Sequence, residues 1–229
     1  MSNSRDKILA TVKGNQPEQR ELPGLPGEEV GDSVGAAAAP GAVGGGDLSG
    51  AFVAMLETIG GSAYLVSGYE RIATILREQY PRVGRIISGC PELAVFAETG
   101  ERYADPHVLE DVGLAVLKAH FGVAENGACW ITEDQMIERA LPFIAQHLAL
   151  IIRCQDIVEN MHAAYEWIEK YEAAAPGEGA GAASYGFATF IAGPSKTADI
   201  EQSLVLGAHG PRSLIVFLID EGLSDAGFY

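Results

Sequence analysis

Cysteine is scarce in this 229-residue sequence, and its three cysteines, Cys90, Cys129 and Cys154, lie far apart. No Cys-x-x-Cys pair is present, which argues against an iron–sulfur cluster or a structural zinc site bound by this chain. An odd number of widely spaced cysteines also argues against a disulfide framework and favours a reducing compartment. We therefore expect a cytoplasmic protein that binds no metal and no cofactor.

Basic residues and long apolar runs are also few. Lysine and arginine number 15 against 31 acidic residues, a formal net charge of −16. Nucleic acids and anionic membranes attract basic surfaces, so this acidic chain is expected to bind neither. The longest strongly apolar stretch, around Leu148 to Ile152, is far shorter than the roughly 20 residues that span a bilayer. The N-terminus also lacks the apolar core of a signal peptide.

Aromatic residues are missing from the first fifty positions, and the first one is Phe52. Residues 17–50 are rich in glycine, proline and alanine, a composition that buries too little apolar surface to offset its ordering entropy. We predict an N-terminal segment, residues 1–50, that is mostly linker or disordered, and a domain over residues 51–229. A short helix is expected over "SRDKILATVKG", between a Ser4 cap and Gly14. The alternative is a tail that docks on the domain or on a neighbouring subunit.

From Phe52 onward, helical periodicity alternates with short apolar runs. The expected strands are "SAYLVSG", "GRIISG", "GLAVLKA", "ACWI", "LALIIR", "YGFATFIAG" and "SLIVFLID". The expected helices are "AFVAMLETIG" and "YERIATILREQY", followed by two segments that open with capping-box patterns, Thr132 with Gln135 and Asp156 with Glu159. The helix after Asp156 would present Ile157, Met161, Tyr165 and Ile168 on its apolar face, and Pro142 interrupts the helix after Thr132.

This alternation predicts an α/β fold with a mainly parallel sheet flanked by helices. Continuous apolar strands such as "LALII" and "LIVFLI" support that prediction, because parallel strands are covered on both faces.

The glycine cluster at Gly177–Gly186 superficially resembles a dinucleotide-binding loop. It follows a predicted helix and precedes a strand, the reverse of the order that such a loop requires, so a flexible loop is favoured. The five histidines show no metal-binding spacing. His209 stands between Gly207 and Gly210, and both a ligand site and a structural turn fit it.

A second candidate site lies in "FGVAENGACW", where Glu125 and Asn126 fall at a turn between two apolar runs. A carboxylate there could act as a base, a nucleophile or a ligand group. The alternative is a simple hairpin, for which Asn126-Gly127 is a favoured type I′ pair. The local chemistry favours the hairpin.

The third candidate is the segment "GPSKTADIEQSLVLGAHGP", from Gly193 to Pro211. It follows a predicted strand, and ligands of open α/β sheets bind at the carboxyl ends of strands. Ser195 or Thr197 would cap a helical turn from Ala198, whose free N–H groups attract anions.

The charged residues of this third segment favour different kinds of ligand. Lys196 would add to the attraction for an anion, whereas Asp199 and Glu201 would favour a cation or a hydroxyl donor. A capped turn with solvated charges fits equally well. If the segment is a site, Ser195–Glu201 and His209 should lie close together around one pocket.

Three stretches of this sequence resemble the lactate utilisation protein C family, which carries the LUD domain. The most specific is "GPSKTADIE" followed by "LGAHGP"; the others are "GVAENGACWI" and "LPFIAQHLALIIRCQDIVENM". The resemblance covers roughly residues 52–229. Asn126 departs from it, because many members have serine or threonine there. The matching candidate residues are Glu125, Gly127, Gly193, Pro194, Ser195, Thr197, Asp199, Glu201, His209 and Gly210; the family assigns them no catalytic role.

The resemblance implies a fold similar to the NagB/RpiA/CoA-transferase group. It also implies membership of a three-protein set that oxidises L-lactate to pyruvate, in which the other two proteins carry the iron–sulfur clusters. The first hypothesis is therefore a non-iron–sulfur component or accessory of that system, with iron–sulfur subunits as its partners. The second is a stand-alone protein or enzyme that binds a small anion, such as a carboxylate, a phosphosugar or an acyl-CoA.

Overall fold

The computed structural model describes residues 4–15, 47–100, 103, 105–174, 185–197, 205–220 and 222–223. The chain divides into two units, residues 1–38 and 39–229. In the first unit, α1 (Ser4–Gly14) matches the predicted short helix. No helix within the described ranges is long and apolar enough to cross a membrane.

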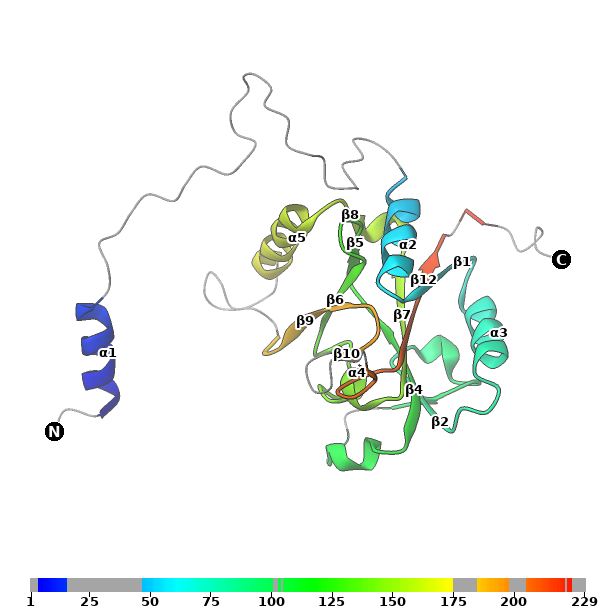
Figure 1. The fold of residues 1–229 in the computed structure, drawn as a ribbon, viewed down its shortest axis with the longest axis horizontal. Coiled ribbons are helices and arrows are strands. Elements are labelled where there is room, and N and C mark those ends of the chain that lie inside the picture. Colours follow the sequence, from blue (N-terminus) through cyan, green and yellow to red (C-terminus); the bar gives the residue numbers. More distant parts are fainter. Residues whose placement is uncertain are drawn as a thin grey trace, which may run out of the picture. The chain divides into compact units, whose positions relative to one another are not determined.

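The second unit is built on a six-stranded sheet in which every neighbouring pair is parallel. The fold class predicted from the alternating pattern is therefore confirmed. In Figure 1, the longest strands of this sheet run through the middle of the unit. In sheet order they are β1 (Ser62–Val66), β12 (Ser213–Ile219), β7 (His147–Arg153), β4 (Val112–Lys118), β2 (Arg85–Ser88) and β3 (Glu98–Thr99).

The central strands are covered on both faces, which explains their unbroken apolar sequences. On β7, Leu148 and Leu150 belong to one hydrophobic cluster, and Ala149 belongs to another. Helix α2 (Leu48–Thr58) packs into the first cluster and α3 (Tyr69–Gln79) into the second. Alternate side chains of one strand therefore stabilise two separate helices on opposite faces.

A smaller sheet of four strands lies beside the first hydrophobic cluster. It contains β8 (Ile157–Val158), β5 (Phe121–Val123), β6 (Ala128–Thr132) and β9 (Ala188–Ala192), in that order. Strand β6 pairs antiparallel with both of its neighbours, and β5 pairs parallel with β8. Helix α5 (Met161–Ala174) covers this sheet through an aromatic cluster that includes Trp130 and Trp167.

Short elements complete the described structure. They are η1 (Pro91–Leu93), η2 (Pro106–Leu109), α4 (Leu141–Ile144), η3 (Cys154–Asp156), and the two-residue strands β10 (Lys196–Thr197) and β11 (Val205–Leu206), which pair antiparallel. Residues 177–184 of the predicted loop lie outside the described residues, and only its last two, Tyr185 and Gly186, are described.

Two predicted helix starts are wrong, because the polar residues of the capping boxes serve other purposes. Thr132 is the last residue of β6, and only Leu141–Ile144 is helical in the following segment. Asp156 ends η3, and α5 begins five residues later at Met161. The side chain of Asn160 accepts a hydrogen bond from Ala163 N at 3.0 Å and so caps α5 instead.

The predicted linker also ends earlier than expected. Residues 48–50 belong to α2, whose N-cap is Asp47; its Oδ1 accepts a hydrogen bond from Gly50 N at 2.9 Å. The cap satisfies a free N–H of the first turn, so the helix begins within the glycine-rich sequence. Before Asp47, the structure describes only residues 4–15, which contain α1; the rest of the predicted N-terminal segment lies outside the described residues.

Candidate functional site

The two described parts of the Gly193–Pro211 segment lie next to each other. Ser195 N donates a hydrogen bond to Pro211 O at 2.9 Å, and Gly207 N donates to Ser195 O at 3.0 Å. Asp199 and Glu201 lie outside the described residues, as does Ala198, where the anion-binding turn was expected. Lys196 and Thr197 form β10.

The expectation that this segment opens at the carboxyl edge of the parallel sheet is wrong. The strand before it, β9, belongs to the smaller sheet and runs antiparallel to β6. The end of the segment leads into the first residue of β12, Ser213, which pairs with the first residue of β7, His147. The segment therefore joins the parallel sheet at its amino edge, opposite the edge where ligands bind in open α/β sheets.

His209 and Gly210 line a hollow of about 430 Å³ at this amino edge. The remaining wall comes from α4 and from the residues before His209, and Phe143 and Ile144 of α4 are substantially exposed there. Apolar side chains of α4 therefore form only part of its lining. Its lining residues are Ala140, Phe143, Ile144, Gly207, Ala208, His209 and Gly210.

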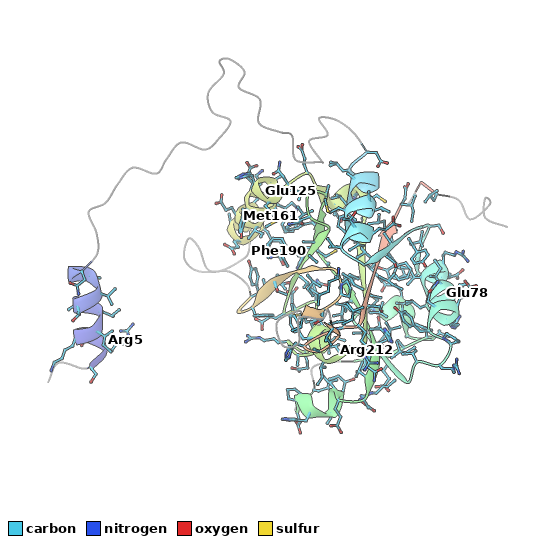
Figure 2. All side chains as sticks on the ribbon, viewed as in Figure 1. Arg5, Glu78, Glu125, Met161, Phe190 and Arg212 are labelled. Atoms are coloured by element: carbon cyan, nitrogen blue, oxygen red, sulfur yellow. The ribbon has the colours of Figure 1, made fainter. Side chains whose placement is uncertain are left out.

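The Glu125–Gly127 turn is a hairpin between β5 and β6, as the local chemistry favours. The predicted type I′ geometry is wrong, since Gly127 has a positive φ of 67° and Asn126 does not. Asn126 Oδ1 accepts a hydrogen bond from Ala128 N and closes the turn. Glu125 Oε2 accepts a hydrogen bond from Met161 N at 3.0 Å, at the start of α5, and Figure 2 shows these two residues together.

The two family motifs meet at the C-terminal end of α2. Gly127 and Gly193 flank paired strand residues, Ala128 and Ala192, and both have left-handed backbones. A Cβ atom on Gly127 would lie 3.0 Å from Leu56 N, and one on Gly193 would lie 2.9 Å from Ile59 O. The two glycines therefore let two turns approach the helix end more closely than any side chain permits.

Lys196 also contacts this helix end; we call Gly127, Gly193 and Lys196 together the seat of α2. Its Nζ donates a hydrogen bond to Ile59 O at 2.5 Å. A cation at the C-terminal end of a helix is favoured by the helix dipole and satisfies a carbonyl that has no partner within the helix. In this structure, the polar groups of Glu125, Asn126 and Lys196 all bind backbone atoms of the chain itself.

A different set of polar residues gathers at the carboxyl edge of the parallel sheet. Lys118, Arg153 and Ile219 end the neighbouring strands β4, β7 and β12, and all three line a cavity of about 290 Å³. The other lining residues are Tyr69, Ala119, His120, Gln135, Ile151, Ile152 and Asp156. The sequence offers a signal for this cavity, because a basic residue lies at or next to the last position of two predicted strands, Lys118 in "GLAVLKA" and Arg153 in "LALIIR".

Lys118 places a positive charge at this cavity and stays protonated at neutral pH. Its Nζ donates to Glu92 Oε1 at 3.0 Å and lies 5.3 Å from the centroid of the Tyr69 ring. Burial acts to lower the pKa of Lys118, but the hydrogen bonds with Glu92 and Tyr69 outweigh it and raise that pKa above its ordinary value. The same ammonium group helps to hold the pKa of Glu92 down, after the larger effect of a backbone hydrogen bond.

Arg153 adds a second cationic group. Its guanidinium makes two hydrogen bonds to Asp156, at 2.6 and 3.1 Å, and both residues line the cavity. The paired carboxylate orients the guanidinium and offsets its charge. The cavity is thus bordered by two lysine or arginine groups, each with its own carboxylate.

His120 also lines the cavity and packs within a ring of aromatic side chains. The ring centroids of Trp130, Tyr171 and Trp167 lie 4.9, 5.0 and 6.0 Å from that of the imidazole. His120 Nε2 lies 2.6 Å from Thr132 Oγ1, and Thr132 Oγ1 donates to Asp134 Oδ1. Burial lowers the pKa of His120, and the charge of Asp134 only partly offsets that effect.

A larger cavity of about 580 Å³ adjoins the same edge at β2 and β3. It shares Gln135 with the first cavity, and Asp134 also lines it. Ile137 borders it with a φ of 65°, a strained conformation for a β-branched residue. Within the described ranges, no group of three or more His, Cys, Asp or Glu side chains is placed to hold a metal ion.

Comparison with known proteins assigns the chain to a family. The family model described as "LUD domain" matches residues 91–219, which is more than half of the chain. The chain belongs to the LUD-domain family. The resemblance drawn from the sequence motifs is thus confirmed, and the matched region contains both Lys118 and His120.

Several curated proteins are similar to this LUD-domain chain. "Lactate utilization protein C" of Bacillus pumilus is 32% identical over 112 residues, covering 49% of this chain and 44% of the relative. The protein of that name from Geobacillus thermodenitrificans is 25% identical over 187 residues, 76% of this chain and 70% of the relative. In the first of these matches and in that to a Bacillus mycoides protein, the chain spans about half the relative's length.

A solved structure supports the fold. The crystal structure of a DUF162 family protein from Deinococcus radiodurans matches with a TM-score of 0.55 and 19% identity. The match covers 76% of this LUD-domain chain and 96% of the other.

The seat of α2 gives a stability prediction. Gly127→Ala should lower the free energy of unfolding by about 1–3 kcal/mol, because it places a Cβ against the α2 backbone in a left-handed conformation. Urea unfolding measures this change. Gly84→Ala is the matched control, since a Cβ there meets nothing within 4 Å, and it should stay within about 0.5 kcal/mol of the parent. If the two substitutions lowered the free energy of unfolding equally, the close packing of Gly127 against α2 would be contradicted.

Proposed function

We propose that this LUD-domain protein is the non-iron–sulfur component of a lactate utilisation system and binds a small carboxylate, lactate or pyruvate, in the cavity at the carboxyl edge. The system is suggested by relatives named "Lactate utilization protein C". The observation that carries the ligand assignment is the charged Lys118 at the end of a central strand. The proposed fold relationship to the NagB/RpiA/CoA-transferase group is consistent with a ligand at this edge.

The position of Lys118 suits a carboxylate ligand. An ammonium group has three donor hydrogens, and Glu92 accepts one of them. A remaining donor on this partly buried cation can form a charge-assisted hydrogen bond with an anion, at a site partly shielded from water. Ile151 and Ile219, which belong to the same hydrophobic cluster, also line the cavity and suit the methyl group of a three-carbon acid.

The state of the cysteines supports the assignment of cluster chemistry to partner subunits. Cys90 and Cys129 are fully buried. Burial raises the pKa of Cys129 to about 12, and it also raises the pKa of Cys90. Iron–sulfur clusters bind thiolates, and these thiols stay protonated at neutral pH. We therefore propose iron–sulfur subunits as partners of this chain, which would act in the cytoplasm.

A stand-alone protein that binds a small anion is the second candidate. The observation that favours it is the same cavity, since a ligand can bind there without any partner. The two candidates differ in the effect that loss of the gene has on the cell, and not in the chemistry of the binding site.

Removal of the Lys118 charge tests the binding site. Lys118→Met keeps the aliphatic stem and should weaken pyruvate and L-lactate binding by about tenfold or more, the loss expected for one charged hydrogen bond. Calorimetric titration of the full chain measures this change. Lys170→Met is the matched control, because Lys170 is exposed on α5 and pairs only loosely with Glu166 at 3.9 Å. Equal affinities of the two variants would refute the site.

Deletion of the gene tests the role in the cell. A clean deletion should abolish growth on L-lactate and leave growth on glucose unchanged. Reintroduction of the parent gene should restore growth on lactate, whereas the Lys118→Met gene should restore it poorly. Normal growth of the deletion strain on lactate would contradict the role in lactate utilisation; if pyruvate still bound to the purified protein, the stand-alone candidate would be favoured.

A further inference from the structure

The hydrogen bonds around Thr132 determine where the proton of His120 lies. A threonine hydroxyl has one hydrogen to donate, and an ionised carboxylate can only accept. Thr132 Oγ1 donates its hydrogen to Asp134 Oδ1, so it must accept from its other neighbour, His120 Nε2, at 2.6 Å. Neutral His120 therefore carries its hydrogen on Nε2 and leaves Nδ1 as a hydrogen-bond acceptor.

The surroundings keep His120 neutral and its ring in place. Thr132 is fully buried, and the imidazole packs among Trp130, Trp167 and Tyr171. Its pKa is lowered by burial, so the acceptor on Nδ1 persists at neutral pH. No hydrogen bond to Nδ1 is formed by any residue within the described ranges.

His120 and Lys118 line the same cavity from positions two residues apart in the chain. We propose that His120 is a specificity-determining residue, whose Nδ1 accepts a hydrogen bond from the 2-hydroxyl group of a small 2-hydroxycarboxylate held at Lys118. This inference rests on the proposed function, because the carboxylate is the one assigned to that cavity. Asp134 and Thr132 act on the ligand only through His120 and are positioning residues.

The arrangement distinguishes a hydroxyl from a carbonyl at the second carbon. A hydroxyl donates to the lone pair on Nδ1, whereas the oxygen of a 2-oxo acid faces that lone pair without a hydrogen between them. A site built to bind a hydroxyl group discriminates strongly against ligands that lack one. The cavity should therefore prefer L-lactate to pyruvate.

Acid should reduce this preference. Protonated His120 carries a hydrogen on Nδ1, which can donate to a carbonyl oxygen. The pKa is lowered, so the neutral acceptor form is complete at neutral pH and is lost as the pH falls through the folded pKa. In the described structure, the ionisable groups around the imidazole and its cavity are Asp134, Tyr171, Lys118, Tyr69, Arg153 and Asp156.

The tautomer can be measured on the unmodified full chain. Two-bond proton–nitrogen spectra of the histidine rings distinguish an Nε2–H from an Nδ1–H imidazole. The signals of His120 are assigned by their loss in His120→Gln. We expect the Nε2–H form at neutral pH. An Nδ1–H form, or a charged imidazolium, at that pH would overturn the proposal whatever the ligand results show.

Ligand selectivity is the second arm, with L-lactate, pyruvate and propionate as probes. The parent protein should bind L-lactate about tenfold more tightly than pyruvate near neutral pH, a difference typical of one hydrogen bond. This ratio of affinities should shrink as the pH falls through the lowered pKa of His120. His120→Gln and Thr132→Val should each reduce the ratio to about threefold or less, because neither keeps a fixed acceptor. Propionate, which has no oxygen on its second carbon, should bind equally to all three proteins.

Matched controls are His162→Gln and Thr74→Val. His162 is exposed on α5, and Thr74 is exposed on α3, where its hydroxyl donates to Glu70 O. Both controls should keep the parent ratio. An unchanged ratio in His120→Gln and Thr132→Val, with carboxylates still bound, would overturn the role of His120 alone. If the parent protein bound none of the three acids, both the proposed carboxylate site and the proposed selectivity would be refuted.

Discussion

The packing of α2 between the two sheets is the constraint on which the rest of the second unit depends. Phe52 and Leu56 are fully buried and share one hydrophobic cluster with strands of the parallel sheet and with Cys129 and Ile131 of the smaller sheet. Burial of two such side chains contributes about 3–6 kcal/mol. The contact also requires close approach, since a Cβ on Gly122 would lie 2.9 Å from the Phe52 ring. One helix thus holds the two sheets together.

This packing also produces the cleft at the carboxyl edge. Strand β4 ends at Lys118 and β5 begins at Phe121, so only two residues, one of them His120, lead from the parallel sheet into the smaller one. Thr132 returns to the same region at the end of β6. Because α2 holds the smaller sheet, His120 and Lys118 line the same cavity. The family motifs do not line this cavity; they contact the C-terminal end of α2 and so help to fix the position of the helix.

Much of the fold follows from local sequence patterns, because the central strands are buried on both faces. "LALIIR" and "SLIVFLID" have no polar residue in the middle, and they form β7 and β12 with the predicted parallel arrangement. The capping boxes failed, since the pattern does not reveal that Thr132 is needed by His120 and Asp134. The sequence predicts the wrong edge for the motif segment from Gly193, because it does not show that the strand before this segment belongs to a second sheet. The cavity itself depends on residues from several elements, and only the basic residues at two strand ends pointed to it.

The location of the ligand is the central claim, and a map of backbone amide shifts tests it most directly. The isotope-labelled protein is titrated with L-lactate, and the change at each assigned amide is recorded. We expect the largest changes at Lys118–His120, Gln135 and Arg153, around the cavity at the carboxyl edge. Changes centred instead on Glu125–Gly127 or on Gly193–Pro211, or no changes at saturating lactate, would contradict that location.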